Sequence, residues 1–430
     1  MNSPSNHLKT TSFAKGWLIW GCAALFYCYQ FIMRVSPNIM ADDLMAAFHI
    51  DACTLGIVSG FYYHTYSGFQ IPGGTLLDKF KPRRVLAVAI ILCSSGTLLF
   101  SFAESIYVAG FSRAIIGAGS ALGFISCFKI GSLWFPAHKL SLIVGLTLTL
   151  GTLGAVSAGY PLAWLLSIYG WRHSLFLLAC AGFVLAIISW IVVKDTPPKE
   201  LKAEVLKSHG GADAHAYPSS LLGNIMEVIR KPQSWLIAFY GFLMYIPLSG
   251  VSDMWGPTFL ISAYGVDKMT AGFINSALYV GLGVGSPVFS YLCNFLKSYK
   301  LTILVSAIGA LLMLSAVYYI PDMPLWLLTT CLFLAGFSLG GQFLAFSMAG
   351  AINPLSAAGT AAGFQNMICM LSGVLFQPFL GWLLDLSWKG NLLNGIRVYT
   401  VSEYTFAFTP IIVCLFLACL CIIPIKEKYV

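Results

Sequence analysis

The segment Gln70-Ile71-Pro72-Gly73-Gly74-Thr75-Leu76-Leu77-Asp78-Lys79-Phe80-Lys81-Pro82-Arg83-Arg84 decides the fold of this chain. It is an apolar run with two glycines that leads directly into an acid and four basic residues. Hydrocarbon cannot accommodate so many charges, so a membrane-spanning helix must end here. The glycines allow a neighbouring backbone to approach closely just before that end.

The composition of the 430 residues places the whole chain in a membrane. Its mean hydropathy is +0.82, 58% of its residues are hydrophobic and only 9% are charged, against about 25% charged in soluble domains. A water-facing globule could not conceal this much apolar surface. The formal net charge of +8 comes from basic residues in short clusters between apolar runs. That distribution indicates membrane orientation rather than binding of nucleic acid.

The apolar runs predict an all-α integral membrane protein with 12 transmembrane helices. Each run is close to the roughly 20 residues that cross a bilayer as a helix, whereas strands of a membrane barrel need only about 10 and alternate in polarity. The expected helices cover residues 15–39, 52–77, 83–103, 107–134, 140–168, 173–193, 233–258, 269–295, 300–320, 325–349, 358–386 and 404–425.

The positions of Lys and Arg predict the orientation of the chain. With both termini in the cytoplasm, that side holds 17 of the 24 basic residues. The outer loops hold Arg172, Lys268, Lys389 and Arg397 among several acids. The polar first 14 residues lack a cleavage site, which predicts an uncleaved first helix. Short termini and loops favour a bacterial inner membrane, with a vacuolar or lysosomal membrane as the alternative.

A polar segment containing Pro and Gly divides the chain. Residues 194–232 are predicted to form a cytoplasmic linker between six-helix bundles at 1–193 and 233–430. The two halves repeat, because the sequence that begins at Pro161 recurs at Pro378, an offset of 217. Such duplication is typical of transporters whose two bundles rock about a site near the membrane midplane.

The opening segment resembles the loop between the second and third helices of the major facilitator superfamily, whose pattern is Gly-x-x-x-Asp-(Arg/Lys)-x-Gly-x-Arg-(Arg/Lys). The matching positions are Gly74, Asp78, Lys79, Arg83 and Arg84. Lys81 replaces the second glycine. The resemblance implies a gating role for the five matching residues, with Asp78 capping the helix that begins near Gly359 and holding the cytoplasmic side shut. The alternative is that the loop only sets the topology.

Further motifs extend the resemblance over nearly the whole chain. Arg113-Ala114-Ile115-Ile116-Gly117-Ala118-Gly119 resembles the superfamily's fourth-helix motif, and Gly170-Trp171-Arg172 resembles the turn before its sixth helix. The Gly-Pro dipeptide of the fifth-helix antiport motif is missing, which argues against a drug exporter. Arg34-Val35-Ser36-Pro37 and Gln70-Ile71-Pro72 resemble the metabolite-uptake branches, namely organic-anion and organophosphate carriers, phagosomal nutrient carriers and lysosomal dipeptide carriers.

Arg34 is the first candidate for binding a solute. An ionisable side chain at membrane depth costs at least about 2.5–3.5 kcal/mol and needs a partner or a water-lined cavity. Arg34 shares a helical stripe with Tyr27 and Gln30. A guanidinium is well suited to binding a carboxylate or a phosphate. The alternative is that Arg34 reaches the outer headgroups or pairs with Asp42 or Asp43.

Arg113 is a second candidate cation, early in the fourth helix. It either contacts substrate or takes part in proton coupling, or it is a structural arginine bonded to the backbone of the first helix. Anion carriers of the resembled family often have a glutamate seven residues later, where this chain has Ser120. The candidates left for proton coupling are His64, because histidine is the side chain type suited to proton exchange near neutral pH, and Asp253. Asp253 is expected either to pair with Arg34 or to face water.

Aromatic and uncharged polar residues complete the predicted substrate cavity, because hydroxyl-tipped rings can hold both an apolar and a polar part of a solute. These residues are Tyr63 and Tyr66 in the first half, and Tyr240, Tyr245, Asn275, Tyr279, Gln342, Asn366 and Gln377 in the second. The alternative for each is ordinary helix packing. Charge in the first half and neutral polarity in the second predict a solute with one anionic end.

The sequence therefore predicts a secondary transporter that takes up a small anionic or zwitterionic metabolite, such as an organic acid, amino acid or short peptide, by alternating access. The alternatives are a proton-coupled exporter of hydrophobic or drug-like compounds and a transport-dead solute sensor. The sequence shows no nucleophile–base pair, metal-ligand spacing or nucleotide loop. We therefore expect no enzymatic activity, cofactor, metal or nucleic-acid partner. We expect a monomer in the lipid bilayer that co-transports protons, with facilitated diffusion or exchange as alternatives.

Overall fold

The computed structural model describes residues 4–136, 139–198, 205, 221–354, 357–393 and 396–426. The first half contains α1 (Pro4–Val35), α2 (Pro37–Phe48), α3 (Ala52–Gly68), α4 (Gln70–Lys79), α5 (Pro82–Ser101), α6 (Ile106–Ser120), α7 (Leu122–Trp134), α8 (Leu140–Ser157) and α9 (Tyr160–Val192). The second half contains α11 (Leu221–Ile229), α12 (Pro232–Ile246), η3 (Pro247–Trp255), α13 (Gly256–Tyr264), α14 (Lys268–Leu296), α15 (Tyr299–Tyr319), α16 (Leu325–Leu339), η4 (Gly340–Phe343), α17 (Leu344–Ile352), α18 (Ala358–Ser387) and α19 (Val401–Cys421).

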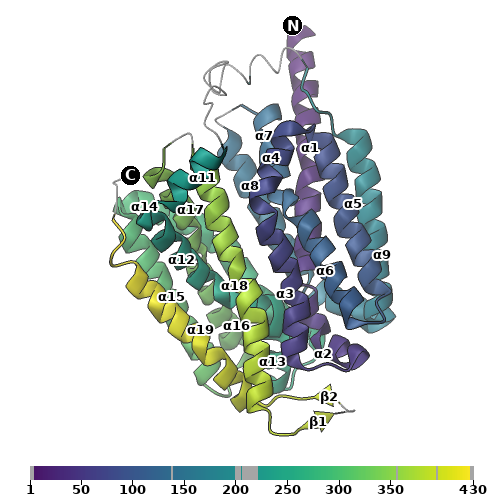
Figure 1. Cartoon of the computed structure of the whole chain (residues 1–430), viewed down its shortest axis with the longest axis vertical. Coiled ribbons are helices and arrows are strands. Elements are labelled where there is room, and N and C mark those ends of the chain that lie inside the picture. The colour runs from purple at the N-terminus through teal and green to yellow at the C-terminus, as the bar shows by residue number, and fades with distance from the viewer. Residues whose placement is uncertain are drawn as a thin grey trace.

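The helices of the two halves form two bundles that lie side by side (Figure 1). Both chain termini lie at one end of the molecule, here called the terminal end. The opposite end, here called the distal end, holds α2, α13 and a small antiparallel hairpin of β1 (Leu392–Leu393) and β2 (Ile396–Arg397) (Figure 1). Most of the predicted linker lies outside the described residues, but its last part forms α11.

Within the described residues, ten helical stretches are long and apolar enough to cross a membrane. The longest, Leu142–Val192, has 51 residues, which is long enough for two crossings. It contains Gly170, whose φ of 70° breaks the helix at the turn that was predicted there. Helices α3 and α4 are not among the ten. They have only 17 and 10 residues, because the helix is interrupted at Phe69. The all-α membrane architecture is thus confirmed, while the number of crossings stays a prediction.

Several helices that were predicted to be continuous are interrupted within their predicted spans. The helix predicted at 15–39 ends at Val35, because Pro37 starts a new helix. The helix predicted at 233–258 contains the π-helix η3, which begins at Pro247. The helix predicted at 325–349 contains the 3₁₀ segment η4, which begins with Gly340 and Gly341. Such interruptions are frequent at functional sites because they redirect side chains.

The two bundles approach most closely along α3 and α18. Glycines make this approach possible. A Cβ atom added to Gly56 would overlap the backbone carbonyl of Gln377, and one added to Gly381 would overlap the carbonyl of Ala52. The two helices therefore lie backbone to backbone toward the distal end, and this contact brings polar side chains of both bundles together.

Candidate substrate site

A buried ion pair lies where the two bundles meet. Arg34, at the end of α1, donates hydrogen bonds from Nε (3.0 Å) and Nη2 (2.9 Å) to Oδ2 of Asp253 in η3. The two side chains are only 3% and 1% exposed. Burying two charges is costly unless further hydrogen bonds satisfy them, so the surroundings of the pair decide whether it is stable.

Tyrosines from three helices surround the pair. Tyr63 of α3 and Tyr279 of α14 donate to the carboxylate of Asp253. Arg34 Nη2 donates to the hydroxyl of Tyr245 in α12. The guanidinium carbon also lies 5.1 Å from the ring centroids of Phe31 and Tyr63 and 5.3 Å from that of Tyr245, within the range of cation–π attraction. Both charges are therefore well compensated without solute.

This geometry decides between the alternatives that the sequence left open for these two residues. Asp253 pairs with Arg34 and does not face water. Arg34 reaches neither the headgroups nor Asp42 or Asp43, since it is buried and paired within the cluster. Asp43 instead accepts a 2.8 Å bond from Lys268 across the distal surface.

Arg113 takes the position of a structural arginine. Its Nη1 donates to the carbonyl of Met33 (2.6 Å) and its Nη2 to the carbonyl of Arg34 (3.3 Å). Its guanidinium carbon lies 4.9 Å from the ring centroid of Tyr62. A cation is favourable at the carbonyl end of a helix. Arg113 thereby holds the end of α1 that carries Arg34.

Amides from three helices hold the other side of the site in place. Asn275 and Asn38 donate to the carbonyl of Ser252 in η3, at 3.1 Å and 2.7 Å. Gln377 donates to the carbonyl of Ser249 at 2.9 Å. A π-helix does not pair its carbonyls in the α-helical pattern, so these amides fix the segment that presents Asp253. Asn38 was not predicted as a site residue, although it lies within the helix expected at 15–39.

Other predicted residues of the first half lie near the pair without contacting it. Gln30 accepts a 2.8 Å bond from Tyr62, and Tyr66 stacks on Tyr62 at 5.7 Å. Tyr27 packs edge-on against Phe31 at 5.1 Å. These buried side chains pack inside the first bundle, on the side of Arg34 that faces the terminal end.

The structure does not bring the remaining predicted residues to the pair. Tyr240 donates to the carbonyl of Ile303 (3.2 Å), on the far side of α12. His64 is exposed on the outer surface of α3 and bonds to the carbonyl of Gly60 (3.0 Å). Asn366 is half-buried beside Tyr66. Gln342 is 3% exposed, and neither atom of its amide has a hydrogen-bond partner in the part of the chain that the structure describes.

Among the predicted gating residues, the structure describes the side chains of Arg83 and Arg84 only. Gly74, Asp78 and Lys79 lie in α4, but the structure does not describe the side chains of Asp78 and Lys79, so the latch at Asp78 stays a prediction. The backbone N–H of Arg83 donates to Asp195 (3.0 Å), and its guanidinium carbon lies 4.3 Å from the ring centroid of Trp190. Arg84 is exposed.

Asp385 is a polar residue that the sequence analysis missed. Near the end of α18, its Oδ2 accepts a 2.7 Å bond from the backbone N–H of Cys53 in α3. Its Oδ1 accepts bonds from Arg397 (2.9 Å) and Tyr399 (2.5 Å). Partial burial tends to lower the pKa of Arg397, but the hydrogen bond and charge of Asp385 raise it above its ordinary value. An acid at the last turn of a predicted helix gives no sign of a partner 332 residues away.

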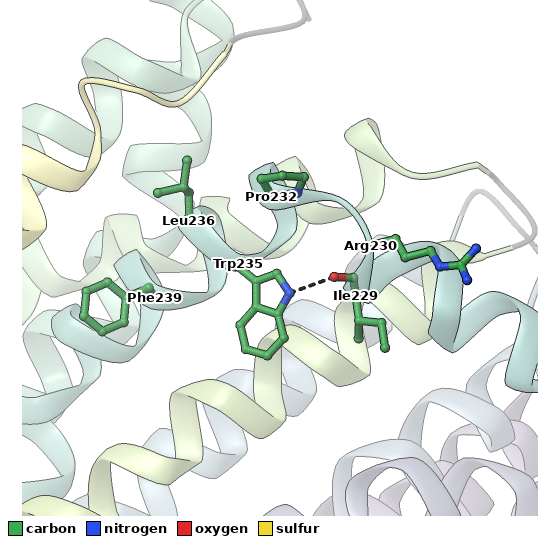
Figure 2. A pocket seen from close by; sticks show the side chains of 6 residues that line it. All are labelled: Ile229, Arg230, Pro232, Trp235, Leu236 and Phe239. Carbon is green, nitrogen blue, oxygen red and sulfur yellow. Dashed lines mark hydrogen bonds between the residues drawn. The ribbon is translucent and has the colours of Figure 1, made fainter.

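A surface pocket of about 620 Å³ lies elsewhere, at the joint between α11 and α12 (Figure 2). Its lining residues are Ile229, Arg230, Pro232, Trp235, Leu236 and Phe239. The indole of Trp235 donates to the carbonyl of Ile229 at 2.8 Å, and the guanidinium of Arg230 points away from the indole (Figure 2). Its apolar residues Trp235 and Phe239 are exposed on the surface of the second bundle. The lining contains none of the residues around Arg34.

The comparisons with known proteins agree with this architecture. The model of the family described as "Major Facilitator Superfamily" matches residues 19–378. The chain belongs to the major facilitator superfamily. It is therefore a multi-pass membrane transporter by family and not an enzyme, as the sequence predicted.

Relatives within the superfamily include two proteins of Escherichia coli. The "Membrane sensor protein UhpC" is 23% identical, with 91% of this chain and 92% of that protein covered. The "Probable galactarate/D-glucarate transporter GudP" is 24% identical, with 85% and 86% covered. Among solved structures, a bacterial homologue of the human lysosomal transporter Spinster, in an inward-facing and unoccupied conformation, superposes with a TM-score of 0.77 at 16% identity. The match covers 95% of this chain and 96% of that one.

Proposed function

We propose that this member of the superfamily takes up a small anionic or zwitterionic metabolite by alternating access, with Arg34 as the group that binds the anionic end. The buried pair of Arg34 and Asp253 carries the proposal, because it lies where the bundles meet and joins them. A transporter named for the dicarboxylates galactarate and D-glucarate is among the relatives, which supports an acid as the solute. We further propose a bacterial inner membrane, cytoplasmic termini and a monomer.

Proton coupling follows from competition for Arg34. In the absence of solute the guanidinium is already neutralised by Asp253. A solute carboxylate or phosphate must displace that carboxylate, and leaving it charged and buried without a partner is costly. Protonation of Asp253 removes this cost, so a proton and an anion bind together. Tyr63 and Tyr279, which donate to Asp253, then become free to donate to the anion.

A zwitterion would use the same two residues differently. Its carboxylate would bind Arg34 while its ammonium group binds Asp253, so the carboxylate of Asp253 would have to stay charged. Binding of an anion, which is favoured by protonated Asp253, should therefore strengthen as the pH falls, whereas binding of a zwitterion, which needs the charged carboxylate, should weaken. The direction of the pH dependence separates the two solute classes.

Gln342 is the proposed contact for the polar remainder of the solute. Its buried amide has no partner among the described residues, and an unsatisfied buried amide costs about 1–3 kcal/mol. A solute hydroxyl or amide would satisfy it. Gln30 and Ser59 also hold buried polar atoms without a partner in the described chain and are the corresponding candidates in the first half.

The test is a thermal-shift screen of the purified protein against organic acids, amino acids, dipeptides and sugar phosphates. A solute at 100 times its Kd should stabilise the protein by about 2.7 kcal/mol. We expect a hit among these classes that disappears in Arg34→Ala and persists in Tyr240→Phe, because Tyr240 points away from the pair. Unchanged stabilisation in Arg34→Ala would rule out Arg34 as the binding group. Stabilisation only by hydrophobic cations would favour the exporter.

A solute sensor is the second candidate function, since a relative named a membrane sensor aligns over nearly its whole length. A sensor and a transporter make the same prediction for binding but not for flux. Uptake of the hit compound into proteoliposomes, driven by an inward proton gradient, decides between them. Binding without flux would identify the sensor.

A further inference from the structure

We propose that Asp385 is a positioning residue of the transport cycle. It clamps the start of α3 to the end of α18, and its hydrogen bond to α3 must break before the distal side can open. The residues of this clamp are Asp385, Arg397, Tyr399 and the backbone of Cys53. The inference rests on the alternating access and the orientation proposed above, in which the distal end faces outside.

The first turn of α3 provides the binding site for the carboxylate. The first backbone N–H groups of a helix have no partner within the helix and carry partial positive charge. Asp51 caps one of them, accepting a 2.9 Å bond from the N–H of Thr54. Asp385 accepts the bond from Cys53 at 2.7 Å. Two carboxylates, one from each bundle, therefore share the positive end of one helix.

The second oxygen of Asp385 is held by its own bundle. Arg397 and Tyr399, on the chain that follows β1, bond to Oδ1. They orient the carboxylate so that its other oxygen points at α3. The side chain of Asp385 is only 12% exposed. An ion pair that does join the two bundles at the distal end, Lys268 with Asp43, is 40% and 37% exposed, and such exposed pairs contribute little.

The glycine contact makes the clamp sensitive to small separations of the bundles. Gly56 and Gly381 let α3 and α18 touch through their backbones. The hydrogen bond from Cys53 to Asp385 forms only at this short approach and is lost once the helices move apart by more than a fraction of an ångström. The clamp is thus either made or broken.

The same pair of helices carries an acid at its opposite end. Asp78 lies in α4, which continues α3 to the terminal end, where α18 begins. The resemblance described above predicts that Asp78 caps the start of α18. Each partner in this antiparallel pair would then end in an aspartate aimed at the first turn of the other. Clamping one end while the other is open would favour two discrete states over intermediate ones.

Cys53 itself supplies the readout. It is half-buried in the clamp, so its labelling by a membrane-impermeant maleimide from outside reports how often the distal end opens, with Cys53→Ser as the background. Asp385→Asn should speed labelling on the order of tenfold, the effect of losing one charge-assisted hydrogen bond. Asp43→Asn, which breaks the exposed pair, should change the rate less than about twofold.

Two further variants separate opening from a local effect on the thiol. Gly381→Ala should push the same two helices apart without changing any charge, so it should also speed labelling. Adding Asp78→Asn to Asp385→Asn should return the rate toward that of the natural chain, because both states then lose their clamp. A thermal unfolding midpoint close to the natural one excludes loss of folding.

Equal labelling of the natural chain, Asp385→Asn and Gly381→Ala would overturn the proposal. So would fast labelling in Asp385→Asn with a natural rate in Gly381→Ala, since that pattern reflects only the charge next to the thiol. The measurement needs no solute. A failed anion site at Arg34 would therefore leave this result unaffected, and a failed clamp would leave the binding test unaffected.

Discussion

Arg34 already has several partners before any solute arrives. Its guanidinium contacts Asp253, Tyr63 and Tyr245. The charge of Arg34 is therefore compensated by protein groups in the absence of a ligand. In the proposed mechanism Arg34 exchanges one carboxylate for another, so that solute binding would depend on the protonation of Asp253.

The variant Asp253→Asn should remove the pH dependence of solute binding. In the natural chain we expect anion affinity to rise as the pH falls, because protonated Asp253 no longer competes for Arg34. Asparagine cannot ionise, so affinity should be high and nearly constant between pH 5 and pH 8. Titrations of the thermal shift at several pH values measure this. A pH dependence retained in Asp253→Asn would assign coupling to another group.

The variant Arg113→Met should destabilise the fold rather than change which solutes bind. It removes the donors to the carbonyls of Met33 and Arg34 while keeping a long apolar side chain. Losing hydrogen bonds from a charged group costs about 1.5–3 kcal/mol, which thermal unfolding in detergent would show. A switch in the preferred solute with unchanged stability would instead make Arg113 a substrate contact.

Among the elements, η3 shows best what the sequence could and could not predict. The apolar run at 233–258 predicted a helix there, and the helix exists. The π-helical turn inside it depends on Asn38, Asn275 and Gln377, which come from three other helices. Hydrophobic periodicity records which face of a helix is buried but contains nothing about donors supplied by neighbours. Polarity predicted Asn275 and Gln377 as site residues, but only the structure shows that they bond to carbonyls of η3 and that Asn38 does so as well.

The variant Asn275→Leu should weaken solute binding through η3 without touching solute. It removes one of two donors to the carbonyl of Ser252, which should cost about 0.5–1.5 kcal/mol of stability and loosen the position of Asp253. We expect a smaller thermal shift for the same solute and a partial loss of pH dependence. Tyr240→Phe serves as the matched control, since it also removes one buried bond to a carbonyl. Equal effects of both variants would deny η3 this role.

At the scale of the whole molecule, the sequence predicted two bundles but not which of their ends is closed. That property depends on contacts between residues far apart in the chain, such as Arg34 with Asp253 and Cys53 with Asp385. Each of these residues looks ordinary in its own segment. The internal repeat indicates that the halves are alike, but it does not indicate how they touch.

Replacing the central pair by apolar residues should separate folding from transport. A buried ion pair exchanged for well-packed hydrophobic residues is often neutral or stabilising, whereas removing one partner costs about 3–5 kcal/mol. The double variant Arg34→Met with Asp253→Leu should therefore unfold near the natural midpoint, and Asp253→Leu alone should unfold well below it. Both should lose solute uptake in proteoliposomes. Uptake retained by the double variant would show that the pair does not form the binding site.

The pairing of Arg34 with Asp253 also bears on the electrical behaviour of the proposed cycle. A charge that crosses the membrane gains or loses about 2.3 kcal/mol per 100 mV. Because the charges of Arg34 and Asp253 cancel each other in the empty carrier, this pair should add nothing to the charge moved in the return step. If one proton binds together with a monovalent anion, the loaded step would also be electrically neutral. A divalent anion with one proton would make that step electrogenic. The current carried per solute would thus report the charge of the natural cargo.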